Sequence, residues 1–147
     1  MILAEHELSD IAVTVTMVDG SFDPLHDGHI EYFRQARSLG LPVLCNIAPD
    51  SWTSTKHSIL LEQGKRAVVL DAIRFIDYVS ISQTSTADIL EKVHPKIYAK
   101  GKDWQEKGGI PQLELDVCAR LQIEVVYLDT VLNSSSELLR KVGGVRK

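Results

Sequence analysis

The chain has few cysteines and no long apolar segment. Its 147 residues include two cysteines, Cys45 and Cys118, and neither lies in a Cys-x-x-Cys or Cys/His pattern. We therefore expect two buried thiols, with a disulfide between them as the minor alternative. The longest apolar runs have the length of strands, so we expect neither a membrane-spanning helix nor a secretory signal, and we expect the protein in the cytoplasm.

Basic residues are also too few to outweigh the acidic ones. The sequence has 16 lysines and arginines against 20 aspartates and glutamates, which gives a net charge of −4. Such a chain has no general attraction for nucleic acid, so a bound anion would need a local basic cluster. A hydrophobic content of 44% and the lack of an internal repeat indicate one globular domain. We assign it to residues 11–147, after a short N-terminal extension over residues 1–10.

The most informative stretch covers residues 19–29 and reads DGSFDPLHDGH. A β-branched run precedes it and apolar residues at helical spacing follow it, so the pattern predicts a strand, a tight loop and a helix start. A helix start presents unpaired N–H groups and the positive end of the helix dipole, where a phosphate binds. Gly20 and Gly28 would let an anion approach the backbone closely.

Two histidines, His26 and His29, flank Gly28 in this stretch. Their spacing allows both imidazoles to converge on one phosphoryl group. A structural alternative is that they cap the helix or bind an adventitious metal. The glycines and the turn-forming Asp-Pro in the same string favour the phosphate site.

The string GSFDPLHDGH resembles the Gly-x-Phe-Asp-x-x-His-x-Gly-His signature of the nucleotidyltransferase superfamily. Members of that superfamily pass a nucleotidyl group from a nucleoside triphosphate to a phosphate-bearing acceptor. The resemblance implies that His26 and His29 contact the triphosphate and stabilise charge on the transferring α-phosphate. It also implies that Asp23 supports the loop and the metal. The expected nucleotide-binding residues of the loop are Gly20, Ser21, Phe22 and Asp23.

Strand-like and helix-like segments alternate along the chain. This alternation predicts an α/β protein with a Rossmann-like, doubly wound, mostly parallel five-stranded sheet and helices on both faces. The expected strands cover residues 11–18, 42–48, 75–81, 96–99 and 123–128. The expected helices cover residues 28–39, 60–74, a short segment between 85 and 95, 111–121 and 133–142. We expect Ile110, Leu113, Val117 and Leu121 to form one apolar stripe.

The polar residues 49–58 follow the second expected strand, and ligands of open α/β sheets bind beyond the carboxyl ends of strands. In this loop and the next helix, Asp50, Lys56 and Arg66 resemble residues of the cytidylyltransferase-like branch, to which residues 13–142 are similar. Lys56 is expected to be catalytic and, with Arg66, to bind the acceptor phosphate or pyrophosphate. The structural alternatives are a solvated lysine and an Arg66–Glu62 pair one helix turn apart. We expect Trp52 to pack over the core, and leave Trp104 open between packing and base stacking.

The loop YAKGKDW combines features of two enzyme types. Lys100 and Gly101 resemble the adenylyltransferases that activate heptose 1-phosphate for lipopolysaccharide, whereas Asp103 resembles glycerol-3-phosphate cytidylyltransferases. Lys102 matches neither. The last expected helix begins with Ser134, Ser135 and Ser136, which are similar to a triphosphate-contacting motif. The arginine that precedes this motif in the glycerol enzymes is absent, which favours a sugar phosphate. A third resemblance, to adenylyltransferases of coenzyme A and NAD synthesis, is weakened because Leu139 replaces their arginine.

The resemblance implies a nucleotidyltransferase that uses a nucleoside triphosphate with Mg²⁺ and releases pyrophosphate. We favour AMP transfer to a small phosphorylated acceptor such as a sugar 1-phosphate, with a glycerol-3-phosphate-type cytidylyltransferase as the alternative. A non-catalytic nucleotide-binding module is the alternative from another class. No dedicated metal-ligand cluster is visible in the sequence. We expect neither nucleic acid nor a membrane as partner, and leave a homodimer open.

Overall fold

The computed structural model describes residues 1–11, 13–106 and 108–129. These residues form a parallel sheet of six strands in the order β1-β4-β3-β2-β5-β6, with helices on both faces. The strands are β1 (Ile2–Leu3), β2 (Thr16–Gly20), β3 (Val43–Ile47), β4 (Tyr78–Ile81), β5 (Ile97–Gly101) and β6 (Glu124–Leu128). The helices are η1 (Glu5–Asp10), α1 (Asp27–Ser38), α2 (Asp50–Thr53), α3 (Gln63–Asp71), α4 (Thr86–Val93), α5 (Asp103–Glu106) and α6 (Gln112–Leu121). The predicted Rossmann-like fold is confirmed.

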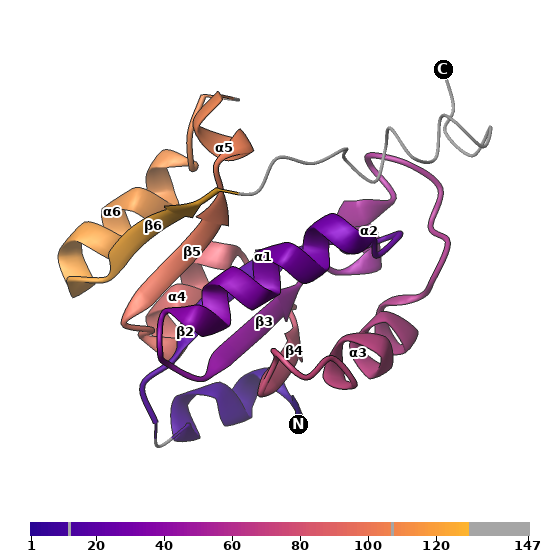
Figure 1. Ribbon diagram of the computed structural model, residues 1–147, viewed down its shortest axis with the longest axis horizontal. Coiled ribbons are helices and arrows are strands. Elements are labelled where there is room, and N and C mark those ends of the chain that lie inside the picture. The colour runs from indigo at the N-terminus through magenta and orange to yellow at the C-terminus, as the bar shows by residue number, and fades with distance from the viewer. Residues whose placement is uncertain (12, 107, 130–147) are drawn as a thin grey trace.

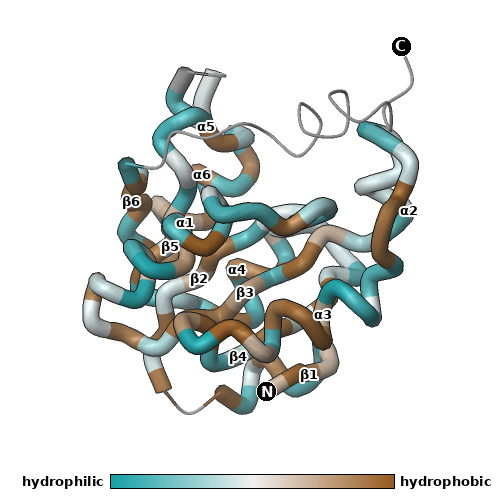
Figure 2. The backbone as a smooth tube through the Cα atoms, turned by 45° about the vertical axis from the view of Figure 1, so that its right-hand side comes forward, coloured by the Kyte–Doolittle hydropathy of each residue, from teal (hydrophilic) through white to brown (hydrophobic). Residues whose placement is uncertain are grey.

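The sheet has six strands and not the predicted five. The additional strand β1 comes from residues 1–10 and pairs with β4, where Ile2 lies opposite Val79. Figure 2 shows the N-terminus beside β4. A strand of two residues is too short to show an alternating pattern, so the sequence did not reveal it. The segment expected to be an extension therefore forms one edge of the sheet.

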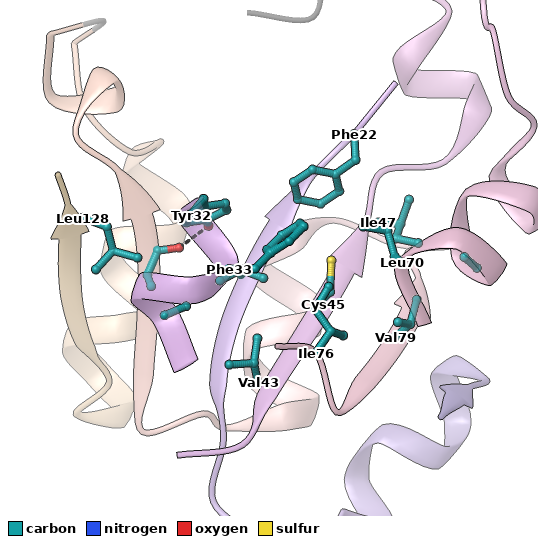
Figure 3. Close-up of a cluster of buried hydrophobic side chains, with 14 of the residues drawn as sticks. Phe22, Tyr32, Phe33, Val43, Cys45, Ile47, Leu70, Ile76, Val79 and Leu128 are labelled. Atoms are coloured by element: carbon teal, nitrogen blue, oxygen red, sulfur yellow. Dashed lines mark hydrogen bonds between the residues drawn. The ribbon is translucent and has the colours of Figure 1, made fainter. Parts of the chain in front are cut away.

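Helices α1 and α3 cover one face of the sheet, and α1 crosses in front of the strands in Figure 1. Phe33 of α1 and Leu70 of α3 pack there against Cys45 and Val79 of the strands (Figure 3). The hydroxyl of Tyr32 donates a hydrogen bond to the Ala99 carbonyl, which fixes α1 over β5. This helix therefore holds the loop that precedes it at the carboxyl end of the central strands.

Helices η1, α4 and α6 cover the opposite face. Leu8, Ile89 and Val117 pack there against Met17 and Tyr98 of the central strands. Cys118 belongs to this cluster, whereas Cys45 belongs to the other one. Both cysteines are buried and free, as expected, and the sheet separates them.

Several predicted boundaries need correction. The first predicted strand, residues 11–18, is β2 over Thr16–Gly20, because pairing with β3 begins only at Thr16. Lys100 and Gly101, expected in a loop, are the last two residues of β5. Leu113 does not join the apolar stripe, since its side chain is 74% exposed next to the start of α6. The last expected helix, residues 133–142, lies outside the described residues, and none of the described helices is long and apolar enough to cross a membrane.

Candidate active site

A cavity of about 580 Å³ opens at the carboxyl ends of the strands. Its walls include Asp19 and Gly20 from β2, Asn46 from β3 and Lys100 from β5. Strands β2 and β5 are neighbours, although the chain leaves β2 towards β3 on the other side. Ligands of open α/β sheets bind at such a switch point, so this cavity is the main candidate site.

His26 and His29 lie at the start of α1, beside this edge of the sheet. His26 is the N-cap, and its Nδ1 accepts a hydrogen bond from the Gly28 amide at 3.1 Å. The Nδ1 atom of His29 accepts from the His26 amide at 3.3 Å. An imidazole nitrogen that accepts a hydrogen bond carries no proton, so each neutral ring carries its proton on Nε2. Both histidines are thus fixed in the tautomer that offers an Nε2–H donor.

The Nε2 atom of His26 is buried and has no hydrogen-bond partner. The two imidazole centroids are 3.8 Å apart, and the edge of Phe22 contacts His29 at a centroid distance of 5.0 Å. An unpaired buried donor costs free energy, which a ligand acceptor such as a phosphate oxygen would recover. This is the geometry expected of a preformed anion site.

Burial lowers the pKa of both histidines. The pKa of His29 falls to about 3 through burial and through the neighbouring His26. Burial also lowers the pKa of His26, although Asp27 opposes the shift. Both rings are therefore neutral at pH 7 before a ligand binds.

The low pKa of His29 predicts a loss of stability in acid. A histidine whose pKa is lower in the folded state binds more protons when unfolded, so its contribution is complete above pH 6.5 and is lost as the pH falls towards 3. At pH 5 the loss attributable to this residue is about 2 kcal/mol relative to pH 7. Urea unfolding of the wild type and His29→Gln at both pH values measures it. If the two proteins lose the same free energy of unfolding between pH 7 and pH 5, His29 is not the titrating group.

Gly20 is required by the ring of Phe22. A Cβ atom at position 20 would lie 2.9 Å from the Phe22 ring, closer than real side chains allow. Phe22 itself adopts a left-handed backbone conformation with φ of 54°, which folds its ring back over Gly20 and against His29. Gly20 thus supports the histidine pair through Phe22, and it also lines the cavity.

Asp23 supports the loop, as the sequence predicts. Its side chain is 1% exposed, and its two carboxylate oxygens accept hydrogen bonds from the amides of Leu60 and Leu61 at 2.9 and 3.0 Å. The predicted helix start at residue 60 is wrong, since α3 starts at Gln63 and the Leu60 and Leu61 amides bind Asp23. With both oxygens engaged in this way, Asp23 connects the signature loop to the segment that precedes α3.

Arg66 is buried beneath the loops, with 1% of its surface exposed. Its guanidinium donates to the carbonyls of Ser21, Ala48 and Leu61 and forms an ion pair with Asp50 at 2.5 Å. The alternative pairing with Glu62 is wrong, because that residue contributes only its backbone carbonyl to Arg66. Arg66 therefore ties together three segments that border the cavity, and it does not line the cavity itself.

Lys56 lies on the surface, in the turn after α2. Its Nζ is 4.5 Å from the centre of the Trp52 ring, and Trp52 lines the cavity. Trp52 is 48% exposed, so the expected packing over the core is wrong. The Ser21 hydroxyl accepts a hydrogen bond from Thr53 at 2.9 Å, which joins the signature loop to α2.

Lys100 projects from the end of β5 into the cavity wall. Its Nζ forms an ion pair with Asp19 at 2.5 Å and lies 4.1 Å from the centre of the Trp104 ring. Trp104 also lines the cavity, whereas Gly101 is buried and Asp103 begins α5. Ser134, Ser135 and Ser136 lie outside the described residues. Among the residues that the structure describes, no group of three or more histidine, cysteine, aspartate or glutamate side chains could hold a metal.

Sequence reasoning missed several residues at the cavity, among them Asp19, Asn46, Thr86 and Glu114. The first two are polar residues near the carboxyl ends of predicted strands. The rule that drew attention to residues 49–58 would have selected them as well. Glu114 belongs to the first turn of α6, where nothing in the sequence indicates that it faces a site.

The chain matches the family model described as cytidylyltransferase-like over residues 17–139. It is 28% identical to an FAD synthase of Methanococcoides burtonii, covering 88% of this chain and 94% of that protein. It is 31% identical to a glycerol-3-phosphate cytidylyltransferase of Staphylococcus aureus, covering 74% and 79%. It is 27% identical to the bifunctional protein HldE of Aliarcobacter butzleri over 84% of this chain, but spans only 26% of that protein.

A solved structure supports the fold. The lipopolysaccharide core biosynthesis protein of Thermoplasma volcanium superposes with a TM-score of 0.69 at 22% identity. The match covers 82% of this chain and 100% of the other one. The likeness therefore extends across the whole of that smaller chain and shows a shared fold.

Proposed function

The chain belongs to the cytidylyltransferase-like family and is a nucleotidyltransferase, and on this premise we propose that it transfers AMP from ATP to a small phosphorylated acceptor. The observation that carries the proposal is the pair of neutral histidines, whose Nδ1 atoms are occupied by backbone amides and whose Nε2–H groups remain as donors. The favoured acceptor is a sugar 1-phosphate, which the resemblance of Lys100 and Gly101 to the heptose enzymes supports.

The reaction needs positioning and charge stabilisation more than covalent chemistry from the protein. An oxygen of the acceptor phosphate attacks the α-phosphorus of the triphosphate, and the bond from that phosphorus to the bridging oxygen of pyrophosphate breaks. The attacking oxygen is already ionised at neutral pH, so no general base is required. The Nε2–H groups of His26 and His29 would donate to oxygens on which charge increases in the transition state.

Basic side chains would neutralise the remaining phosphate charge. Lys56 is exposed beside Trp52 at the cavity, from where it can reach an acceptor phosphate or pyrophosphate. Arg66 would hold the loops around the cavity in place and would not contact a phosphate directly, because its donors already bind Ser21 and Asp50. Ser134, Ser135 and Ser136 stay predicted triphosphate contacts.

Mg²⁺ would enter with the triphosphate. The described residues fit this mode, because no group of three or more of their histidine, cysteine, aspartate and glutamate side chains could hold a metal by itself. When bound, the ion would offset the charge of the leaving pyrophosphate.

A second candidate is a cytidylyltransferase that uses glycerol 3-phosphate. The relative from Staphylococcus aureus, matched over 79% of its length, favours it, as does the resemblance of Asp103 to the glycerol enzymes. Thermal-shift measurements with Mg²⁺ and either ATP or CTP separate the two, because a ligand that binds only the folded state raises the melting temperature. We expect the larger shift with ATP. A shift with CTP alone would move the glycerol-type activity to first place.

Pyrophosphate release tests the proposed function. ATP and CTP are each incubated with Mg²⁺ and a panel of sugar 1-phosphates, glycerol 3-phosphate and FMN. We expect pyrophosphate only when triphosphate and acceptor are both present. No release from any pair would count against the proposal.

A further inference from the structure

A row of polar side chains crosses the middle of the sheet. Ser80 of β4 lies opposite Asn46 of β3, and Asn46 lies opposite Asp19 of β2. Met17 pairs with Tyr98, so the residues two positions further, Asp19 and Lys100, lie at the same level of β2 and β5. Strands buried on both faces are normally apolar, and buried polar groups are costly unless they are paired or bind a ligand.

The row lies on the face covered by η1, α4 and α6. Side chains two residues apart on a strand point to the same face. The residues two positions before Asp19, Asn46 and Lys100 are Met17, Leu44 and Tyr98, which belong to the core cluster under these helices. The histidine pair belongs to α1, which covers the opposite face. The row and the histidines are thus two separate parts of one sheet edge, and Asp19, Asn46 and Lys100 line the cavity.

Most members of the row have partners within the protein. Asp19 pairs with Lys100 at 2.5 Å and accepts a hydrogen bond from the Thr86 hydroxyl at 3.2 Å. The hydroxyl of Tyr98 lies 3.3 Å from Asp19 and donates to Oε1 of Glu114 at 2.7 Å. These bonds hold two carboxylates and one amine at the cavity wall.

Asn46 is the exception. Its side chain is 2% exposed, and its Oδ1 accepts a weak hydrogen bond from Ser80 at 3.4 Å. Its amide nitrogen, however, has no acceptor among the described residues. The cavity is the side from which an acceptor could reach it. The amide nitrogen is therefore a donor that is available to a ligand in the cavity.

The charge of this wall selects against an anion. The two carboxylates of Asp19 and Glu114 outnumber the Lys100 amine, which Asp19 already neutralises. A wall that offers both donors and acceptors without positive charge matches hydroxyl groups, which can donate and accept. Trp52 and Trp104 also line the cavity and supply flat apolar surfaces.

We propose, building on the proposed function, that this wall binds the hydroxyl groups of the acceptor, which is a small sugar or polyol phosphate. Asn46 donates to one hydroxyl, and the second carboxylate oxygen of Glu114 accepts from another. The Asp19–Lys100 ion pair lies in the same wall and binds neither hydroxyl group directly. The acceptor phosphate lies outside this wall, towards the histidines and Lys56.

Two substitutions test the assignment. Asn46→Leu removes the donor at similar volume. Glu114→Gln keeps an oxygen for Tyr98 but replaces the second oxygen with an N–H donor. The matched control is Asp116→Asn, an exposed carboxylate on the same helix α6 that does not line the cavity. Calorimetry measures the Kd of each protein for a sugar 1-phosphate, for inorganic phosphate and for FMN.

We expect both variants to raise the Kd for the sugar 1-phosphate about tenfold, as loss of one hydrogen bond does. The Kd for inorganic phosphate and the thermal shift with ATP should stay at the wild-type values, as should all values for the control. Wild-type sugar phosphate binding by both variants would overturn the inference, as would FMN binding more tightly than any sugar phosphate. If one variant does not fold, the other decides. Weakened sugar phosphate binding without pyrophosphate release would uphold this inference and reject the proposed function.

Discussion

Replacing His26 with asparagine should lower turnover about a hundredfold and leave the stability of the protein unchanged. Asparagine is among the best N-cap residues, so its side-chain oxygen can take over the hydrogen bond from the Gly28 amide. It cannot replace the buried Nε2–H donor. Loss of one preorganised donor to developing charge costs about 3 kcal/mol of transition-state stabilisation, which corresponds to about two orders of magnitude in rate. Steady-state kinetics and thermal unfolding of one preparation measure both effects.

His26→Ala and His6→Ala are the controls for this result. His26→Ala should lose the same rate and, in addition, about 1 kcal/mol of stability, because alanine cannot cap the helix. His6 is exposed in η1 and lies outside the signature, so its substitution should change neither quantity. An unchanged kcat in His26→Asn, with a KM that rises in parallel with the Kd for ATP, would show that His26 contributes only uniform binding.

Replacing Arg66 with methionine should lower the free energy of unfolding by about 3–5 kcal/mol. The guanidinium holds the carbonyls of Ser21 and Ala48 and the Asp50 carboxylate, and methionine would leave these acceptors without donors. Arg66 is only 1% exposed. Removal of its charge therefore lowers the free energy of unfolding by much more than burial of the methionine side chain raises it. Urea unfolding measures the change.

Lys65→Met is the matched control, since Lys65 is the exposed neighbour of Arg66 on the same helix. It should change the free energy of unfolding by no more than about 0.5 kcal/mol. The double variant of Arg66→Met with Asp50→Asn should be less destabilised than the sum of the two single variants, because the pair shares one interaction. Equal stability of the Arg66 and Lys65 variants would show that the buried network is not important for the fold.

The signature loop was predictable because its information is local. Residues 19–29 specify a strand end, a turn and a helix start through glycine, Asp-Pro and histidine at fixed spacing, and the structure places β2 and α1 there. The two-residue strand β1 was not predictable, because it is stabilised by its pairing with β4, where Ile2 lies opposite the distant Val79. Leu113 was misassigned because helical spacing alone does not show whether the first turn of α6 is covered, and Leu113 is exposed there.

The polar row and the position of Arg66 depend on which strands are neighbours. Asp19 lies beside Lys100 only because β5 pairs with β2, and a sequence does not display this pairing. Arg66 matches a family position, but only the fold shows that its donors are directed at Ser21, Ala48 and Asp50. The motifs thus predicted the reaction class. Only the tertiary structure distinguishes residues that can contact a ligand from residues, such as Arg66, that hold the loops in place.

The fate of the α-phosphate of ATP tests the central claim most directly. ATP labelled at the α-phosphorus and ATP labelled at the γ-phosphorus are each incubated with the protein, Mg²⁺ and a sugar 1-phosphate, and the products are separated. Nucleotidyl transfer at the histidine pair predicts that the α label appears in the acceptor conjugate and the γ label in pyrophosphate, and that His26→Asn slows both about a hundredfold. Transfer of the γ label to the acceptor, or equal rates for the wild type and His26→Asn, would contradict the account.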